Sequence, residues 1–214
     1  MKILYEDKYL AVVYKPPGIA SQPDTRGGND MVTLLSEKWQ KSAFCVHRLD
    51  TATGGVMVYA KDSKTAGRLT EALSSDTAKK EYICAVLAEN VGKGSMKDLL
   101  FHDKRKNKAY VVDRMRSGVK EALLDYEAVA KRDGISLVRV TLHTGRTHQI
   151  RVQFASRKMP LLGDGKYGSR TNSPLALHCF HLAFTHPYTG KLTDTVFLPE
   201  GDWFGFDTSV LAGR

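Results

Sequence analysis

The sequence between residues 122 and 142 reads ALLDYEAVAKRDGISLVRVTL. Two strand-like segments, residues 122–131 and 135–142, flank the pair Asp133 and Gly134. An Asp-Gly pair between two such segments is typical of a tight β-hairpin, because both residues tolerate the positive φ that this turn requires. The stretch therefore predicts two antiparallel strands and points to a sheet built from hairpins.

Further strand-like segments lie on both sides of this hairpin. Residues 2–15 contain two β-rich runs around a polar turn, which predicts a second hairpin. Apolar segments that predict single strands are residues 56–60, 80–88, about 175–185 and 192–198. So many strands favour a mostly antiparallel sheet over an alternating βαβ fold.

Three segments show the apolar spacing of helices. Asp30 is expected to cap a helix over residues 31–41. Ser63 is expected to cap a second helix, and Thr147 a third helix over residues 147–157. The sequence thus predicts a few helices beside the sheet.

The length of 214 residues suits one domain, and we expect residues 1–214 to form a single domain. The predicted fold class is α+β, with a large mixed, mostly antiparallel sheet and a few flanking helices. No apolar run approaches the ~18 residues of a membrane span, and the N-terminal segment is too polar for a secretion signal. We therefore expect a cytoplasmic protein with no membrane partner.

Basic residues outnumber acidic ones. Lysine and arginine total 32 against 23 aspartates and glutamates, a net charge of +9. Residues 97–120 alone contain eight basic and three acidic side chains, with a possible short hairpin inside the segment. A basic surface favours a polyanionic partner through attraction and counterion release. A solvated charged face without a partner is the alternative explanation for this segment.

The cysteines Cys45, Cys84 and Cys179 are far apart in the sequence and form no CxxC pair. This spacing indicates reduced thiols and no disulfide framework. His178, Cys179 and His181 lie close together, but their spacing matches no standard zinc site. We expect a buried strand there and no metal.

The loop HRLDTATGG, residues 47–55, places one carboxylate between an arginine and a glycine pair. The loop leads into an apolar strand, and loops on a rigid scaffold often carry functional residues. From the residues alone, Asp50 is a candidate nucleophile, a candidate general base or a turn or helix cap.

A second string, LHTGRTHQIR at residues 142–151, contains two arginines and two histidines at a predicted strand-to-helix junction. The N–H groups at a helix start suit a phosphate, and Arg146 would add a bidentate clamp. Arg151 is expected to pair with a carboxylate, and a surface arginine is the alternative. Tyr82 is either a core residue or a surface on which a nucleobase stacks.

HRLDTATGG resembles the signature loop HRLDxxTSG of the RluA-type pseudouridine synthases. KPPGI near the start, KKEY, TGRTHQIRVQ, GDGKYG and LHCFHLAFTHP resemble further segments of that family, in the family's order. The sequence departs from the pattern at Gly54, where serine is usual, and at Gln153, where histidine is common. The resemblance implies the pseudouridine synthase fold with a central RNA-binding cleft, and we expect no S4-type RNA-binding domain.

The resemblance implies isomerisation of uridine to pseudouridine in ribosomal or transfer RNA, without cofactor, metal or energy source. Asp50 matches the family's catalytic aspartate, Tyr82 the tyrosine that packs against the target base, and Arg151 the arginine that pairs with the catalytic carboxylate. Whether Asp50 attacks the sugar, attacks the ring or removes a sugar proton stays open.

We expect Asp50 and Arg151 to form an ion pair, because burying a carboxylate without a counter-charge is strongly unfavourable. This pair is the sharpest structural prediction. The residues that we expect to contact RNA are Arg48, Arg146, His148, Lys104, Arg105, Lys106 and Lys108.

We expect a monomer with no obligate protein partner. The alternative functions are an RNA-binding module without chemistry and an RNA hydrolase or base-removing glycosylase.

Overall fold

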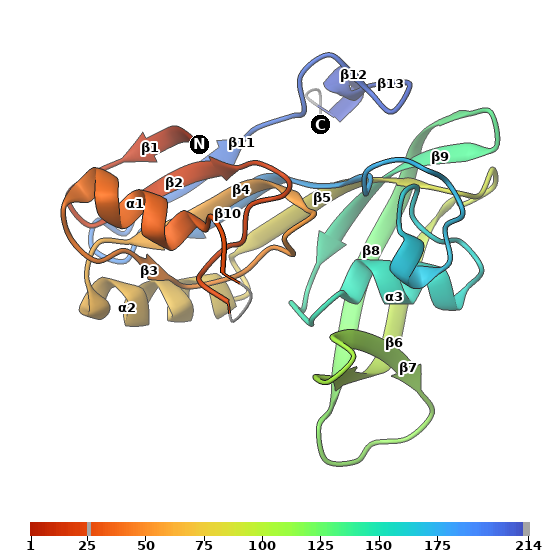
Figure 1. Ribbon diagram of the computed structural model, residues 1–214, viewed down its shortest axis with the longest axis horizontal. Helices are drawn as coiled ribbons and strands as arrows, with labels where there is room; N and C mark the ends of the chain where they lie inside the picture. The colour runs from red at the N-terminus through yellow and green to blue at the C-terminus, as the bar shows by residue number, and fades with distance from the viewer. Residues whose placement is uncertain (25–26, 212–214) are drawn as a thin grey trace. The chain divides into compact units, whose positions relative to one another are not determined.

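The computed structural model describes residues 1–24 and 27–211 (Figure 1). Contacts among these residues divide the chain into two compact units. Of the described residues, the first unit contains 1–24, 27–80 and 179–198, and the second contains 81–178 and 199–211. The single domain over residues 1–214 stays a prediction.

The strands of the first unit follow the order β1 (Lys2–Glu6), β2 (Leu10–Lys15), β4 (Gly54–Ala60) and β10 (Leu177–Thr185), the last of which enters this unit at Cys179. The ladders from β1 to β2 and from β2 to β4 are antiparallel. β3 (Phe44–Cys45) pairs with β4, and β11 (Leu192–Val196) pairs with β10. The hairpin predicted over residues 2–15 is confirmed as β1 and β2.

Two helices belong to the first unit, α1 (Met31–Trp39) and α2 (Ser63–Ser74). Asp30 caps α1 as predicted, since its carboxylate accepts a backbone N–H of the first turn at 3.0 Å. The prediction that Ser63 caps α2 is wrong. Asp62 is the cap, because its carboxylate reaches the N–H three residues later at 2.7 Å while Ser63 is already helical.

The core of the first unit fixes strand β4. Leu69 and Leu73 of α2 pack in one buried cluster with Val56 and Val58 of β4 and with Phe184 of β10. Burying each such side chain contributes roughly 1.5–3 kcal/mol. The loop that leads into β4 therefore ends, at Gly54, on a strand that the core holds in place.

The second unit also contains antiparallel ladders. Its strands follow the order β5 (Lys79–Val86, from Glu81 onward in this unit), β9 (Ile135–Leu142), β8 (Val119–Arg132), β6 (Lys93–Asp103) and β7 (Lys108–Val112).

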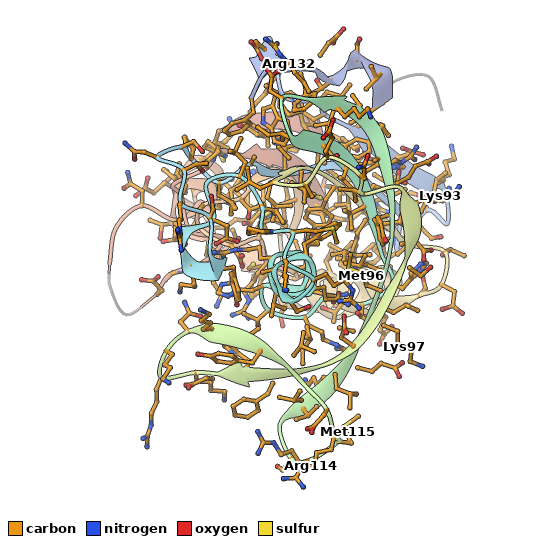
Figure 2. All side chains as sticks on the ribbon, turned by 90° about the vertical axis from the view of Figure 1, so that its right-hand side faces the viewer. Lys93, Met96, Lys97, Arg114, Met115 and Arg132 are labelled. Atoms are coloured by element: carbon orange, nitrogen blue, oxygen red, sulfur yellow. The ribbon has the colours of Figure 1, made fainter. Side chains whose placement is uncertain are left out.

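The two hairpins of the second unit agree with the sequence analysis. Asp133 and Gly134 join β8 to β9 with φ angles of 52° and 77°, as a tight hairpin turn requires. The possible hairpin within the basic segment is confirmed as β6 and β7. Figure 2 shows Arg114 and Met115 in the connection from β7 to β8, far from Arg132 at the other end of β8.

The helix of the second unit is α3 (Gln149–Ser156). The prediction that Thr147 caps it is wrong. The residue before the helix is His148, which has a left-handed backbone with φ 54° and makes no side-chain cap. The remaining elements are the 3₁₀ turns η1 (Gly165–Tyr167) and η2 (Thr208–Leu211) and the paired short strands β12 (Asp202–Trp203) and β13 (Phe206–Asp207).

The predicted fold class is confirmed: the chain is α+β, with a large, mostly antiparallel sheet and three helices in the described residues. Eleven strands of the described chain belong to the main sheet. No helix among the described residues is long and apolar enough to cross a membrane. The central cleft stays a prediction.

Candidate active site

Asp50 lies in the first unit, in the loop between β3 and β4. The Thr53 N–H donates to the Asp50 carbonyl at 2.9 Å, which closes a turn. The carbonyl of Thr51 accepts the Gly18 N–H at 2.8 Å and the Lys15 ammonium at 3.2 Å. The KPPGI segment therefore holds the backbone of the loop that carries Asp50.

Lys15 is fully buried beneath this loop. Its ammonium also donates to the carbonyls of Pro16 at 3.1 Å and Ile19 at 2.7 Å. Burial lowers the pKa of Lys15 to about 8, and the charge of Asp50 acts in the opposite direction. Lys15 is therefore protonated at neutral pH and supplies positive charge near Asp50 from within the same unit.

The sequence analysis missed Lys15. The available signal was a lysine at the end of the apolar strand β2, since a buried charge in such a place needs partners.

The backbone immediately before Asp50 is held by Ser21. The Leu49 N–H donates to the Ser21 hydroxyl at 3.0 Å, and this hydroxyl donates to the Leu49 carbonyl at 2.8 Å. The Tyr59 hydroxyl in turn donates to the Ser21 carbonyl at 2.8 Å. Leu49, Ser21 and Tyr59 are all buried, so water competes little with these bonds.

His47 anchors the start of the same loop to β4. Its Nε2 accepts the Val58 N–H at 3.1 Å, so the proton of the neutral ring is on Nδ1. Burial, with a smaller contribution from the charge of Lys80, lowers the pKa of His47 to about 3. The imidazole therefore stays neutral at physiological pH and acts as a fixed acceptor.

Gly55 permits a close approach of β4 to β10. A Cβ at this position would lie 2.3 Å from the carbonyl oxygen of Cys179 and 2.6 Å from its nitrogen. The φ of Gly55 is also +137°, which L side chains rarely adopt. Glycine is required here on both counts.

The two departures from the family pattern are both buried. Gly54 is a buried residue of β4. Gln153 on α3 donates from Nε2 to the Met96 carbonyl at 3.2 Å and to Asp98 at 2.7 Å. Gln153 thus fastens α3 to β6.

Tyr82 lies in the second unit on β5, opposite Val140 of β9, and only 8% of its surface is exposed. Its neighbour Glu81 accepts two hydrogen bonds from the Arg139 guanidinium, at 3.1 and 2.7 Å, and one from the Thr141 hydroxyl at 3.3 Å. These bonds secure the strand on which Tyr82 is carried.

Arg151 lies in the second unit on the first turn of α3. Its Nε and Nη2 donate to the two carboxylate oxygens of Asp164 at 2.7 and 2.8 Å. The expected pairing of Arg151 with a carboxylate therefore exists, and Asp164 is one such carboxylate. Asp50 belongs to the other unit, so the Asp50–Arg151 ion pair stays a prediction.

Asp164 was not among the predicted site residues. It lies in the GDGKYG turn, which was noted only as a matching segment. The signal in the sequence was a single acid between two glycines, 13 residues after an arginine on a predicted helix.

His148 is buried, and its Nδ1 lies 2.9 Å from the Tyr167 hydroxyl. The same hydroxyl accepts the Ala109 N–H at 2.8 Å. The strained left-handed backbone of His148 is thus tied to β7 through Tyr167. An RNA contact of His148 stays a prediction.

Arg48 is exposed, and Arg146 is half-buried. The Arg146 Nε donates to the Glu121 carbonyl at 2.8 Å, and its backbone N–H donates to the Gln149 side chain at 3.0 Å. The side chain of Arg146 is therefore directed towards β8 by a bond that the sequence did not indicate. Its role as a phosphate clamp stays a prediction.

The turn between β6 and β7 displays basic side chains. Lys104, Arg105 and Lys106 are exposed there, while the Asp103 carboxylate accepts the N–H groups of the latter two at 2.9 and 3.1 Å. Lys108 lies on β7, with its ammonium 5.1 Å from the centre of the Tyr167 ring. The turn presents positive charge on an ordered backbone.

The histidines and cysteines are engaged in the fold. His181 lies 2.9 Å from Asp194, and the buried His186 lies 2.8 Å from Asp7. Burial raises the pKa of Cys45 to about 11 and also raises that of the buried Cys84. Among the described residues, no group of three or more histidine, cysteine or acidic side chains is placed to hold a metal.

The family model described as RNA pseudouridylate synthase matches residues 9–156. The chain belongs to this family, of the RluA type. The matched range contains Asp50, Tyr82 and Arg151. The resemblance drawn from the sequence motifs is thereby confirmed.

Two curated relatives illustrate the similarity. The chain is 33% identical to Ribosomal large subunit pseudouridine synthase D of Nitrosomonas europaea, over 90% of this chain and 60% of that protein. It is 33% identical to Dual-specificity RNA pseudouridine synthase RluA of Yersinia pestis, over 89% of this chain and 95% of that protein. The chain spans 62 to 66% of the length of three other curated relatives.

A solved structure, Human RNA Pseudouridylate Synthase Domain Containing 4, shares the fold. The TM-score is 0.76 at 23% identity, and the match covers 93% of this chain and 89% of that chain. This likeness shows the pseudouridine synthase fold that the sequence motifs implied.

Proposed function

We propose that this protein is an RNA pseudouridine synthase that isomerises specific uridines in ribosomal or transfer RNA. The observation that carries the proposal is the family match over residues 9–156. One relative is named for the large ribosomal subunit and another for dual specificity, so ribosomal RNA is the first substrate to test.

The proposed reaction conserves all atoms and electrons. The bond from uracil N1 to the sugar C1′ breaks, the base turns, and a bond from C5 to C1′ forms. The proton on C5 is lost and N1 takes up a proton, so no oxidant, cofactor or energy source is consumed. Because a stacked base cannot turn over, the nucleotide must leave its stack, which costs a few kcal/mol.

Asp50 is the proposed catalytic residue. Its loop is held by hydrogen bonds of Lys15, Ser21 and His47, which fix the backbone on either side of the carboxylate. Such fixed placement is what positioning a reactive group requires, because a misplacement of about 1 Å can cost about 100-fold in rate. Attack on the sugar, attack on the ring and removal of a sugar proton remain the three possible actions of Asp50.

Tyr82 and Arg151 complete the proposed site. Tyr82 packs against the target base and takes part in removing the proton from C5, and Arg151 pairs with the Asp50 carboxylate. Lys15 adds a second positive charge near this carboxylate.

The proposed RNA contacts come from Arg48, Arg146, His148, Lys108 of β7 and the basic turn of Lys104, Arg105 and Lys106. The exposed side chains of the turn support this role, since phosphate contacts supply most of the affinity for RNA.

The test is tritium release from RNA labelled at uracil C5, with ribosomal and transfer RNA transcribed in vitro as separate substrates. We expect wild type to release tritium and convert uridine to pseudouridine, with no dependence on added metal. Asp50→Ala should lower the rate by at least ~1,000-fold, which corresponds to about 4 kcal/mol of transition-state stabilisation.

The control is Asp50→Asn, which keeps the shape of the side chain. We expect its affinity for RNA to stay within about threefold of wild type, a change of less than 1 kcal/mol. Free uracil or strand cleavage would instead identify a glycosylase or a hydrolase. RNA binding without turnover on either RNA class would identify a binding module.

A further inference from the structure

The pairing of Arg151 with Asp164 fixes a guanidinium in one plane. Nε donates to one carboxylate oxygen at 2.7 Å and Nη2 to the other at 2.8 Å. The side chain of Asp164 is only 1% exposed and that of Arg151 only 10% exposed. Two parallel charge-assisted bonds of this kind define both the position and the orientation of the group.

Tyr167 confines the same guanidinium from a second direction. The central carbon of the Arg151 guanidinium lies 5.1 Å from the centre of the Tyr167 ring. The ring is held in turn, because its hydroxyl accepts the Ala109 N–H at 2.8 Å and lies 2.9 Å from His148 Nδ1. Asp164 and Tyr167 both come from the GDGKYG turn, so one short segment sets the guanidinium from two sides.

We propose that Asp164 is a positioning residue for Arg151. Its carboxylate holds the guanidinium edge formed by Nε and Nη2, so that the rest of the group is presented in a single orientation for the reaction. The inference rests on the proposed function, in which Arg151 pairs with the catalytic carboxylate. Asp164 itself does not touch the substrate.

Stability alone is a weak reason for such a pair. Removing two charges from water costs several kcal/mol, and well-packed apolar residues often serve as well or better. The pair of Arg157 and Asp98 shows the contrast at the other end of α3. It is also bidentate, at 2.9 and 3.1 Å, but the Arg157 side chain is 35% exposed. Both pairs link α3 to another segment, and only the first involves a proposed site residue.

The experiment compares Asp164→Asn with the matched control Asp98→Asn, in the full chain and on the RNA that wild type modifies. Each variant removes the charge from one bidentate partner of an arginine on or next to α3. We expect Asp164→Asn to lower kcat by about 100-fold with KM for RNA within about twofold of wild type. Asp98→Asn should lower thermal stability and leave kcat within about twofold.

A spectroscopic readout does not depend on turnover. In ¹H–¹⁵N NMR spectra, the variant Arg151→Lys assigns the Arg151 Nε–H signal, because that signal disappears. We expect this signal to exchange slowly with water in wild type and much faster in Asp164→Asn. Asp164→Glu restores the charge on a longer side chain and should recover part of kcat relative to Asp164→Asn.

The outcomes separate this inference from the proposed function. Wild type without turnover on any RNA overturns the proposed function, whatever the variants do. Wild type with turnover and equal kcat in the two Asn variants overturns the role of Asp164. If Asp164→Asn does not fold, a folded Asp164→Glu that keeps wild-type kcat while the Arg151 Nε–H exchanges fast with water also overturns it, because kcat then does not depend on a fixed guanidinium.

Discussion

The loop of Asp50 is proposed to carry the catalysis, and the turn of Lys104, Arg105 and Lys106 is proposed to attract RNA. The two segments are held in different ways. The loop is fastened through its backbone by three side-chain groups: an ammonium, a serine hydroxyl and a neutral imidazole. The turn displays its side chains to solvent, and the Asp103 carboxylate orders its backbone. The difference indicates that bond-making chemistry depends on position, while attraction of a polyanion depends on charge.

The largest effect is expected where the loop enters β4. Gly55→Ala puts a methyl group 2.3 Å from the backbone oxygen of Cys179, which β10 cannot relieve without shifting. We expect the free energy of unfolding to fall by at least ~3 kcal/mol in urea titrations, the upper range for overpacking. The control is Gly67→Ala on the exposed face of α2, where no atom lies within 4 Å.

This control should raise stability by about 0.5–1 kcal/mol, because alanine is the better helix former. A Gly55→Ala protein as stable as wild type would show that the loop tolerates a displaced strand. That result would contradict the conclusion that the Asp50 loop depends on a fixed position.

The second effect is a pH dependence of the free energy of unfolding, caused by His47. The pKa of His47 is about 3 in the folded protein and about 6.5 in an unfolded chain. At pH values between about 3 and 6.5, the His47 imidazole is protonated in the unfolded chain and neutral in the folded protein. The contribution of His47 to stability is therefore fully present above pH 6.5 and is lost as the pH falls. The expected loss is up to ~1.4 kcal/mol per pH unit.

Urea titrations at pH 7 and pH 5 measure this loss. His47→Gln keeps an acceptor for the Val58 N–H without a titrating ring, so it should be less sensitive to this change of pH. His102→Gln alters a histidine whose only described bond, to Asn107, is long and exposed, and it should behave as wild type. A steep dependence that persists in His47→Gln would assign the effect to other groups.

The smallest effect is expected from the turn, and it concerns binding. Replacing Lys104, Arg105 and Lys106 by alanine should weaken RNA binding about tenfold while kcat and the free energy of unfolding stay near wild type. The slope of log affinity against log salt should fall by about 2 to 3, the value for three phosphate contacts.

The control removes the same charge from Lys38, Lys41 and Lys64, which are exposed in the first unit. Filter binding at several salt concentrations compares the two triple variants. Equal losses would mean that net charge alone, and not this turn, attracts the RNA.

Local signals in the sequence were enough for most of the fold. The Asp133–Gly134 hairpin and the Asp30 cap depend on a few adjacent residues, and both are confirmed. The two wrong caps show the limit of such signals. Asp62 and Ser63 are both good caps, and which one is used depends on where the first helical residue falls. His148 precedes α3 in a left-handed backbone that tertiary bonds through Tyr167 maintain.

The partners of charged site residues were harder to predict. Arg151 was correctly expected to bind a carboxylate, but no pattern selects Asp164 over other acids until the turn at 163–168 is folded against α3. Lys15 was missed because its three carbonyl partners are backbone groups, which the sequence does not distinguish. The motifs identify which residues matter, and the fold decides what each one touches.

The raised pKa values of the native thiols have a practical consequence. With a pKa of about 11, Cys45 is in the reactive thiolate form in only about one molecule in ten thousand at pH 7. Cys84 is buried and still less reactive. A cysteine introduced at an exposed position on each unit would therefore react with maleimide dyes much faster than Cys45 or Cys84. Energy transfer between the two dyes would then report any change in the distance between them as RNA is added.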